Sequence, residues 1–145
     1  MSNALVVAEH VNGSLRKVTG ATVAFARQAA DLTGGEVIVL VLGSDASGVV
    51  EEASQIGADK VLFEDNPAFS NYLAENYAPA VARVASDFDA TFVCAPSSTF
   101  GKDLLPCVAA TLEAGMVSDA IAVWDEGGIK FKRPLWAGNV ITTVE

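Results

Sequence analysis

The side chains best suited to chemistry in this sequence lie in two short segments. The first is Glu9-His10, in which the histidine could serve as a general base near neutral pH and the glutamate as an acid. The second is Ser97-Ser98-Thr99, whose hydroxyls and backbone N–H groups could bind an anion ahead of a helix. A lone Glu-His pair is weak evidence for catalysis, and hydroxyls in front of a helix usually cap it. We therefore expect structural, capping or subunit-contact roles for both segments.

Neither of the common glycine-rich phosphate-binding loops is present. The stretch after the first apolar run, residues 9–14, holds a single glycine, whereas a dinucleotide fingerprint needs several that are closely spaced. Gly101-Lys102 resembles the end of a P-loop, but Pro96 takes the place of its opening glycine and Asp103 that of its metal-binding hydroxyl. Because an acid at that position repels phosphate, the sequence predicts no such site.

Composition excludes several other classes of site and partner. The 145 residues include 9 basic and 18 acidic side chains, so the net charge of −9 opposes nucleic-acid binding. A single histidine and two cysteines, Cys94 and Cys107, provide too few ligands for a metal site. We expect both cysteines to be small buried hydrophobes in a reducing compartment.

Apolar runs such as Val37–Leu42 are far shorter than the roughly 20 residues of a membrane span, so we expect no membrane insertion. The amino terminus also lacks the pattern of a secretory signal. This indicates the bacterial cytoplasm, or the mitochondrial matrix if a transit peptide has been removed.

The elements that must position the two segments alternate between strand and helix. Apolar runs predict strands at Ala4–Ala8, Val37–Leu42, Lys60–Phe63 and Ala90–Ala95. Helical spacing and stop signals predict helices at Val18–Leu32, from Ser47 to Gly57, from near Ala78 to Phe88 and from Gly101 to Glu113. The third helix is started near Ala78 because Pro79 suits a first helical turn. After Gly115 the pattern predicts a hairpin of Ala120–Trp124 and Ile129–Arg133, followed by a strand at Val140–Val144.

Strands alternating with helices predict a three-layer α/β/α fold with a mostly parallel, Rossmann-like sheet. We expect residues 1–145 to form a single domain whose carboxyl-terminal antiparallel hairpin extends that sheet at an edge. Trp124 and Trp136 are expected to be packing residues. The strand-like run reaches the final residue without a terminating turn, which predicts that these residues belong to a longer chain.

Three sets of segments, in order along the chain, resemble the alpha subunits of electron-transfer flavoproteins. They are Val6–His10 with Gly34–Val37, Ser98–Pro106 with Val108–Ala110 and Val117–Asp119, and Arg133–Asn139. Together they span almost the whole sequence, which makes the resemblance far more specific than a lone glycine motif.

The resemblance implies the amino-terminal domain of such a subunit, with a fold similar to the adenine-nucleotide alpha-hydrolases. In that family FAD is bound by a separate carboxyl-terminal domain, which is missing here, and AMP by the beta subunit. The resemblance therefore implies no cofactor in this domain and no catalytic site of its own. The domain would instead pair with the beta subunit and form a platform for the FAD domain. The FAD domain would move on this platform between electron donors and an acceptor. The donors would be dehydrogenases, such as the acyl-CoA dehydrogenases of fatty acid beta-oxidation, and the acceptor a protein such as a membrane quinone reductase.

The resemblance also suggests where contacts with the beta subunit or the FAD domain would lie. The candidates are the carboxyl-terminal hairpin and the residues Glu9, His10, Ser97, Ser98, Thr99, Phe100, Gly101, Lys102 and Asp103.

Two other functions remain open from the sequence. One is a stand-alone AMP- or ATP-binding protein of the stress-protein type, although its phosphate loop is missing. The other is a small α/β hydrolase that uses His10, although no Gly-x-Ser-x-Gly nucleophile elbow is present.

Overall fold

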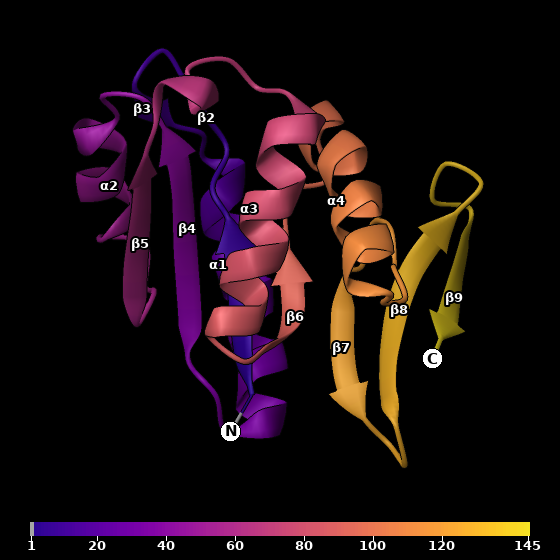
Figure 1. The fold of residues 1–145 in the computed structure, drawn as a ribbon. Helices are drawn as coiled ribbons and strands as arrows, with labels where there is room; N and C mark the ends of the chain where they lie inside the picture. The colour runs from indigo at the N-terminus through magenta and orange to yellow at the C-terminus, as the bar shows by residue number, and fades with distance from the viewer. Residues whose placement is uncertain (1) are drawn as a thin grey trace.

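The computed structural model describes residues 2–145 and contains a parallel sheet covered by helices, with an antiparallel sheet beside it (Figure 1). Its strands are β1 (Asn3–Val7), β2 (His10–Val11), β3 (Ser14–Leu15), β4 (Val37–Gly43), β5 (Lys60–Asp65), β6 (Ala90–Cys94), β7 (Ala122–Asp125), β8 (Ile129–Leu135) and β9 (Val140–Val144). Its helices are α1 (Val18–Thr33), α2 (Ser47–Ala53), the short 3₁₀ helix η1 (Pro67–Phe69), α3 (Ala74–Asp87) and α4 (Thr99–Leu112).

The parallel sheet has the strand order β5-β4-β1-β6 and is apolar on both faces. Successive side chains of a strand point to opposite faces. On β1, Leu5 and Val7 pack with α3 and α4, while Ala4 and Val6 pack with α1 and α2. All seven residues of β4 are buried, as expected of a strand covered on both sides. The predicted three-layer α/β/α fold is therefore confirmed.

Helix α3 begins at Ala74, so the predicted start near Ala78 is wrong. Tyr77, in the first turn, is buried and packs edge-to-face against Phe69 of η1, with ring centroids 5.3 Å apart. Pro79 therefore lies inside the helix, where its ring costs one backbone hydrogen bond near the amino-terminal end. The tertiary packing of Tyr77 outweighs this local preference.

The boundaries of two other helices also differ from prediction. α2 ends at Ala53, before the predicted stop at Gly57, and turns fill the interval. α4 begins at Thr99 rather than Gly101, because Ser98 occupies the N-cap and accepts a hydrogen bond from the N–H of Gly101 at 3.4 Å.

Asn12 and Gly13 form the tip of a small hairpin made by β2 and β3. Asn12 and Gly13 adopt φ values of 52° and 74°, which short polar residues and glycine tolerate in tight turns. The hairpin stands at the carboxyl end of β1, next to Glu9, whose carbonyl accepts a hydrogen bond from the N–H of Arg16 at 2.9 Å.

The carboxyl-terminal strands form a sheet of their own, with the order β7-β8-β9. We expected them to extend the parallel sheet, but their ladder joins only one another, and β7 packs against α1 instead. Within residues 2–145, Val123 is the one apolar side chain of this sheet that is buried. The prediction that Trp136 packs inside is wrong, since 78% of the residue is exposed.

Candidate functional site

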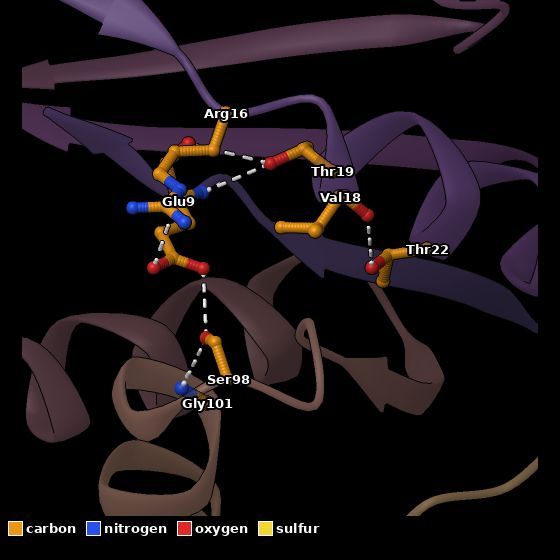
Figure 2. A network of polar contacts seen from close by, with 7 residues as sticks. All are labelled: Glu9, Arg16, Val18, Thr19, Thr22, Ser98 and Gly101. Atoms are coloured by element: carbon orange, nitrogen blue, oxygen red, sulfur yellow. Dashed lines mark hydrogen bonds and ion pairs between the residues drawn. The ribbon is translucent and has the colours of Figure 1, made fainter.

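The carboxyl ends of β1 and β6 meet where ligands bind in related α/β folds. The chain adds β4 and β5 on one side of β1 and then places β6 on the other side, so the strand order reverses between β1 and β6. Glu9 follows β1 and Ser98 follows β6. The hydroxyl of Ser98 donates a hydrogen bond to Oε2 of Glu9 at 2.7 Å across this point (Figure 2).

The backbone of Glu9 is held there by α1, and its side chain lies near the segment before that helix. Glu9 is only 8% exposed. Its backbone N–H lies 3.2 Å from Oγ1 of Thr19, and that hydroxyl lies 3.4 Å from the Glu9 carbonyl oxygen. Arg16 places Nε 4.0 Å from Oε1 of Glu9 and balances its charge (Figure 2). A carboxylate thus occupies the position at which related folds bind phosphate.

Close packing requires a glycine at position 101. A Cβ at this position would lie 1.8 Å from the carbonyl oxygen of Pro96, so only glycine lets the first turn of α4 approach the preceding loop. Gly101 therefore serves the start of the helix, as does Ser98, and the capping role expected of residues 97–99 is confirmed for Ser98.

The nine predicted contact residues lie on two sides of the start of α4. One cavity of about 410 Å³ is lined by Glu9, His10, Thr99, Phe100 and Asp103, together with Val11 and Tyr72. Ser97, Ser98, Gly101 and Lys102 instead line a cavity of about 380 Å³ between α1, α4 and residues 116–120. No single site unites all nine.

Tyr72 belongs to the first cavity and was missed by the sequence analysis. Its hydroxyl donates a 2.7 Å hydrogen bond to Oδ2 of Asp103, and its ring packs edge-to-face on Phe100 and Tyr77. Burial and the neighbouring Asp103 raise the pKa of Tyr72 well above its ordinary value, so it remains a neutral donor. A 3₁₀ turn and a bend position these rings, so the segment before Tyr77 has neither helical nor strand periodicity. The sequence pattern therefore gave no indication that Tyr72 belongs to this cavity.

Lys102 forms an ion pair with Asp119, with Nζ 3.2 Å from Oδ1. Both residues belong to the segments that carry the family resemblance, but their pairing was not predicted. The contact connects α4 to the segment that leads into β7. Because both side chains are partly exposed, at 55% and 35%, its contribution to stability is expected to be small.

His10 is engaged with the backbone rather than with a nucleophile. Its Nε2 lies 2.7 Å from the carbonyl oxygen of Leu42, which requires the proton on Nε2. The Tyr77 hydroxyl donates a longer bond, of 3.4 Å, to the same carbonyl. This arrangement anchors β2 to the end of β4 and offers no support for the hydrolase hypothesis.

The two cysteines differ in environment. Desolvation raises the pKa of the Cys94 thiol to about 12, which makes this sulfur unreactive at neutral pH. Cys94 is partly buried and Cys107 is exposed on α4, so the prediction that both cysteines are buried is wrong for Cys107 and holds only in part for Cys94.

Across residues 2–145, no group of three or more His, Cys, Asp or Glu side chains is arranged to hold a metal ion. Over the same range, no helix combines the length and apolar character needed to cross a bilayer.

Comparison with known proteins identifies the same family as the sequence motifs. Residues 4–145 match the family model described as the electron transfer flavoprotein domain. The alpha subunit of the electron transfer flavoprotein of Pseudomonas aeruginosa is 42% identical over 142 residues, or 97% of this chain and 43% of that protein. The alpha subunit of the electron transfer flavoprotein of Bacillus subtilis is 34% identical over 142 residues, which are 97% of this chain and 43% of that protein. A probable mitochondrial alpha subunit of Caenorhabditis elegans is 34% identical over 100% of this chain and 42% of its own length. The chain thus spans less than half the length of these relatives.

Proposed function

This chain belongs to the electron transfer flavoprotein family, and on that premise we propose that residues 1–145 are the amino-terminal domain of an alpha subunit. The domain acts as a platform that pairs with a beta subunit and supports a separate FAD-binding domain. The assembled protein carries electrons from flavoprotein dehydrogenases, such as acyl-CoA dehydrogenases, to a quinone reductase or another acceptor. It does so in the bacterial cytoplasm or the mitochondrial matrix.

The observation that carries this proposal is the Glu9 carboxylate at the reversal of strand order. It engages the Ser98 hydroxyl in a hydrogen bond, and the half-exposed Arg16 guanidinium lies at ion-pair distance from it. A phosphate placed beside Glu9 would meet a like charge in a partly desolvated site, which is unfavourable. A domain whose own carboxylate lies where a phosphate would bind is better suited to a scaffold than to a nucleotide-binding module.

The cavity of about 410 Å³ beside Glu9 is a candidate contact surface within the assembled flavoprotein. It combines the Tyr72 and Phe100 rings with the Asp103 carboxylate, and it opens at the carboxyl edge of the sheet. Aromatic side chains with nearby polar groups are common in protein interfaces.

One observation favours the nucleotide-binding alternative. A neighbouring cavity of about 450 Å³ at the carboxyl ends of β1 and β4 is lined by His10, Asp45, Phe69, Tyr77 and Phe100, among other residues. Its volume is in the range of small-molecule sites, although Asp45 would repel phosphate.

The test is to purify the chain, record its absorption spectrum, identify any small molecule released by heat, and mix it with the beta subunit of the same organism. We expect a colourless protein that releases neither flavin nor nucleotide and binds the beta subunit. Released AMP or ATP without binding of the beta subunit would favour the alternative. Released flavin would contradict the placement of FAD outside these residues.

A further inference from the structure

Two adjoining cavities open at the carboxyl end of the parallel sheet. The larger, of about 450 Å³, lies between the β2–β3 hairpin, the loop after β4 and η1, and the smaller, of about 410 Å³, lies beside it at the start of α4. Four residues line both cavities, so the two form one recess: His10, Val11, Tyr72 and Phe100. The hairpin, η1 and the amino-terminal ends of α3 and α4 gather at this end of the sheet (Figure 1). A recess of this size can enclose a small molecule.

One wall of the recess is aromatic. The rings of Tyr72, Tyr77 and Phe100 pack edge-to-face, with centroids 4.9 to 6.1 Å apart and planes inclined by 65° to 85° to one another. Tyr77 is almost fully buried, whereas Tyr72 and Phe100 are only partly buried and line both cavities. Because the face of an aromatic ring carries partial negative charge, such a wall attracts cations.

The charged groups of the recess are carboxylates. Asp45, in the loop after β4, lines the larger cavity, and Asp103, on α4, lines the smaller one. Among the ion pairs of residues 2–145, none includes either carboxylate, although Asp103 accepts a hydrogen bond from the Tyr72 hydroxyl. His10 directs its Nε2 proton to the carbonyl of Leu42, so Nδ1 of the neutral ring is an acceptor. Of the described residues that line either cavity, none is a lysine or an arginine.

We propose that this recess binds a small organic cation, such as a quaternary or methylated ammonium. Its charge would lie near Asp45 and Asp103, and its methyl groups would lie against the rings of Tyr72 and Phe100. A phosphate would face two carboxylates instead, which like charges oppose. A bare metal ion is not favoured, because across residues 2–145 no group of three or more His, Cys, Asp or Glu side chains is arranged to hold one. The site goes beyond the proposed function, since it requires neither the beta subunit nor FAD.

Two ligands of the same shape test whether charge is recognised. Choline carries a quaternary ammonium, and in dimethylbutanol a carbon atom replaces that nitrogen and the charge is absent. Nuclear magnetic resonance titration of the isotope-labelled chain reports both the affinity and the residues whose signals move. Choline should bind at least about tenfold more tightly than dimethylbutanol and move the signals of Asp45 and Phe100. Its affinity should fall as the salt concentration rises, because salt screens the carboxylates.

Three variants of the chain test whether the recess is the site. Asp45→Asn removes a charge and should weaken choline binding by about threefold or more, and asparagine tolerates the φ of 53° at this position. Phe100→Leu keeps an apolar side chain without the ring and should weaken binding by a similar factor. Asp87→Asn is the matched control, because this exposed residue lies at the last position of α3, at the end far from the recess. Its affinity should stay within about twofold of wild type. Urea denaturation checks that each variant is folded.

Several results would overturn the inference. If dimethylbutanol binds as tightly as choline, the recess recognises shape and not charge. If Asp87→Asn loses as much affinity as Asp45→Asn, the net charge of the chain attracts the ligand and the recess does not. If AMP binds and choline does not, the nucleotide-binding alternative is favoured, and if neither binds, the recess holds only solvent. Pairing with the beta subunit is measured separately, so failure of this inference leaves the proposed function intact.

Discussion

The two sheets of this molecule use similar apolar side chains for different purposes. In the parallel sheet, Ile38 is fully buried between β1, α3 and α4. In the antiparallel sheet, Ile141 is 53% exposed, and strand β9 has no buried residue. The first region carries the hydrophobic core, whereas the second is held by its hydrogen-bond ladder and by the packing of β7 on α1.

This difference separates stability from association. Free energy of folding comes mainly from apolar surface removed from water, so the parallel sheet should determine whether the chain folds. Apolar surface that stays in water gains nothing until a partner covers it. The antiparallel sheet is therefore the part expected to contribute to binding rather than to folding.

The largest expected effect comes from a pair of matched isoleucines. Ile38→Ala should lower the free energy of unfolding by about 2–5 kcal/mol because it leaves a cavity in the core. Ile141→Ala should change it by less than about 0.5 kcal/mol because the side chain is already solvated. Urea denaturation of both variants checks this, and equal losses would show that the two sheets share one core.

A pair of matched glycines should give an intermediate effect. Gly101→Ala drives a Cβ against the Pro96 carbonyl and should cost about 1–3 kcal/mol, as overpacking does. Gly115 lies in the segment between the two regions, and a Cβ added there would meet no atom within 4 Å beyond its chain neighbours. Gly115→Ala should therefore be neutral or stabilise the fold by up to about 1 kcal/mol. Thermal denaturation compares the two, and a stable Gly101→Ala protein would contradict the close approach at α4.

The smallest expected effect is on the pH dependence of stability, through Asp59 beside the parallel sheet. A hydrogen bond from the N–H of Val37, with help from Arg27, holds the pKa of Asp59 below its ordinary value. A lowered folded-state pKa gives stability that is present above the ordinary pKa and is lost as the pH falls through the folded value.

Asp59→Asn should therefore lower the melting temperature at pH 7 by about 1–3 °C, and the difference should vanish near pH 3. Asp31→Asn, an exposed position on α1, is the control and should show no such dependence. A loss for Asp59→Asn that persists in acid would mean that packing, and not ionisation, is responsible.

Much of the fold could be read from local patterns. Runs such as Val37–Leu42 are apolar at every position, and this pattern over so short a length is typical of a strand covered on both faces. The start of α3 was misplaced because the rule for proline is local, whereas the packing of Tyr77 against Phe69 is not. The partners of Tyr72 and Lys102 were missed for the same reason, since each lies on another element.

By itself, the sequence determined the alternation of strands and helices, the absence of a glycine-rich phosphate loop and the family, because these depend on residue types at short spacing. Only the tertiary structure decided that Glu9 reaches Ser98, 89 positions away, and that Trp136 remains in solvent. Both outcomes depend on how distant strands are ordered and how much surface each element covers, and no local pattern records either.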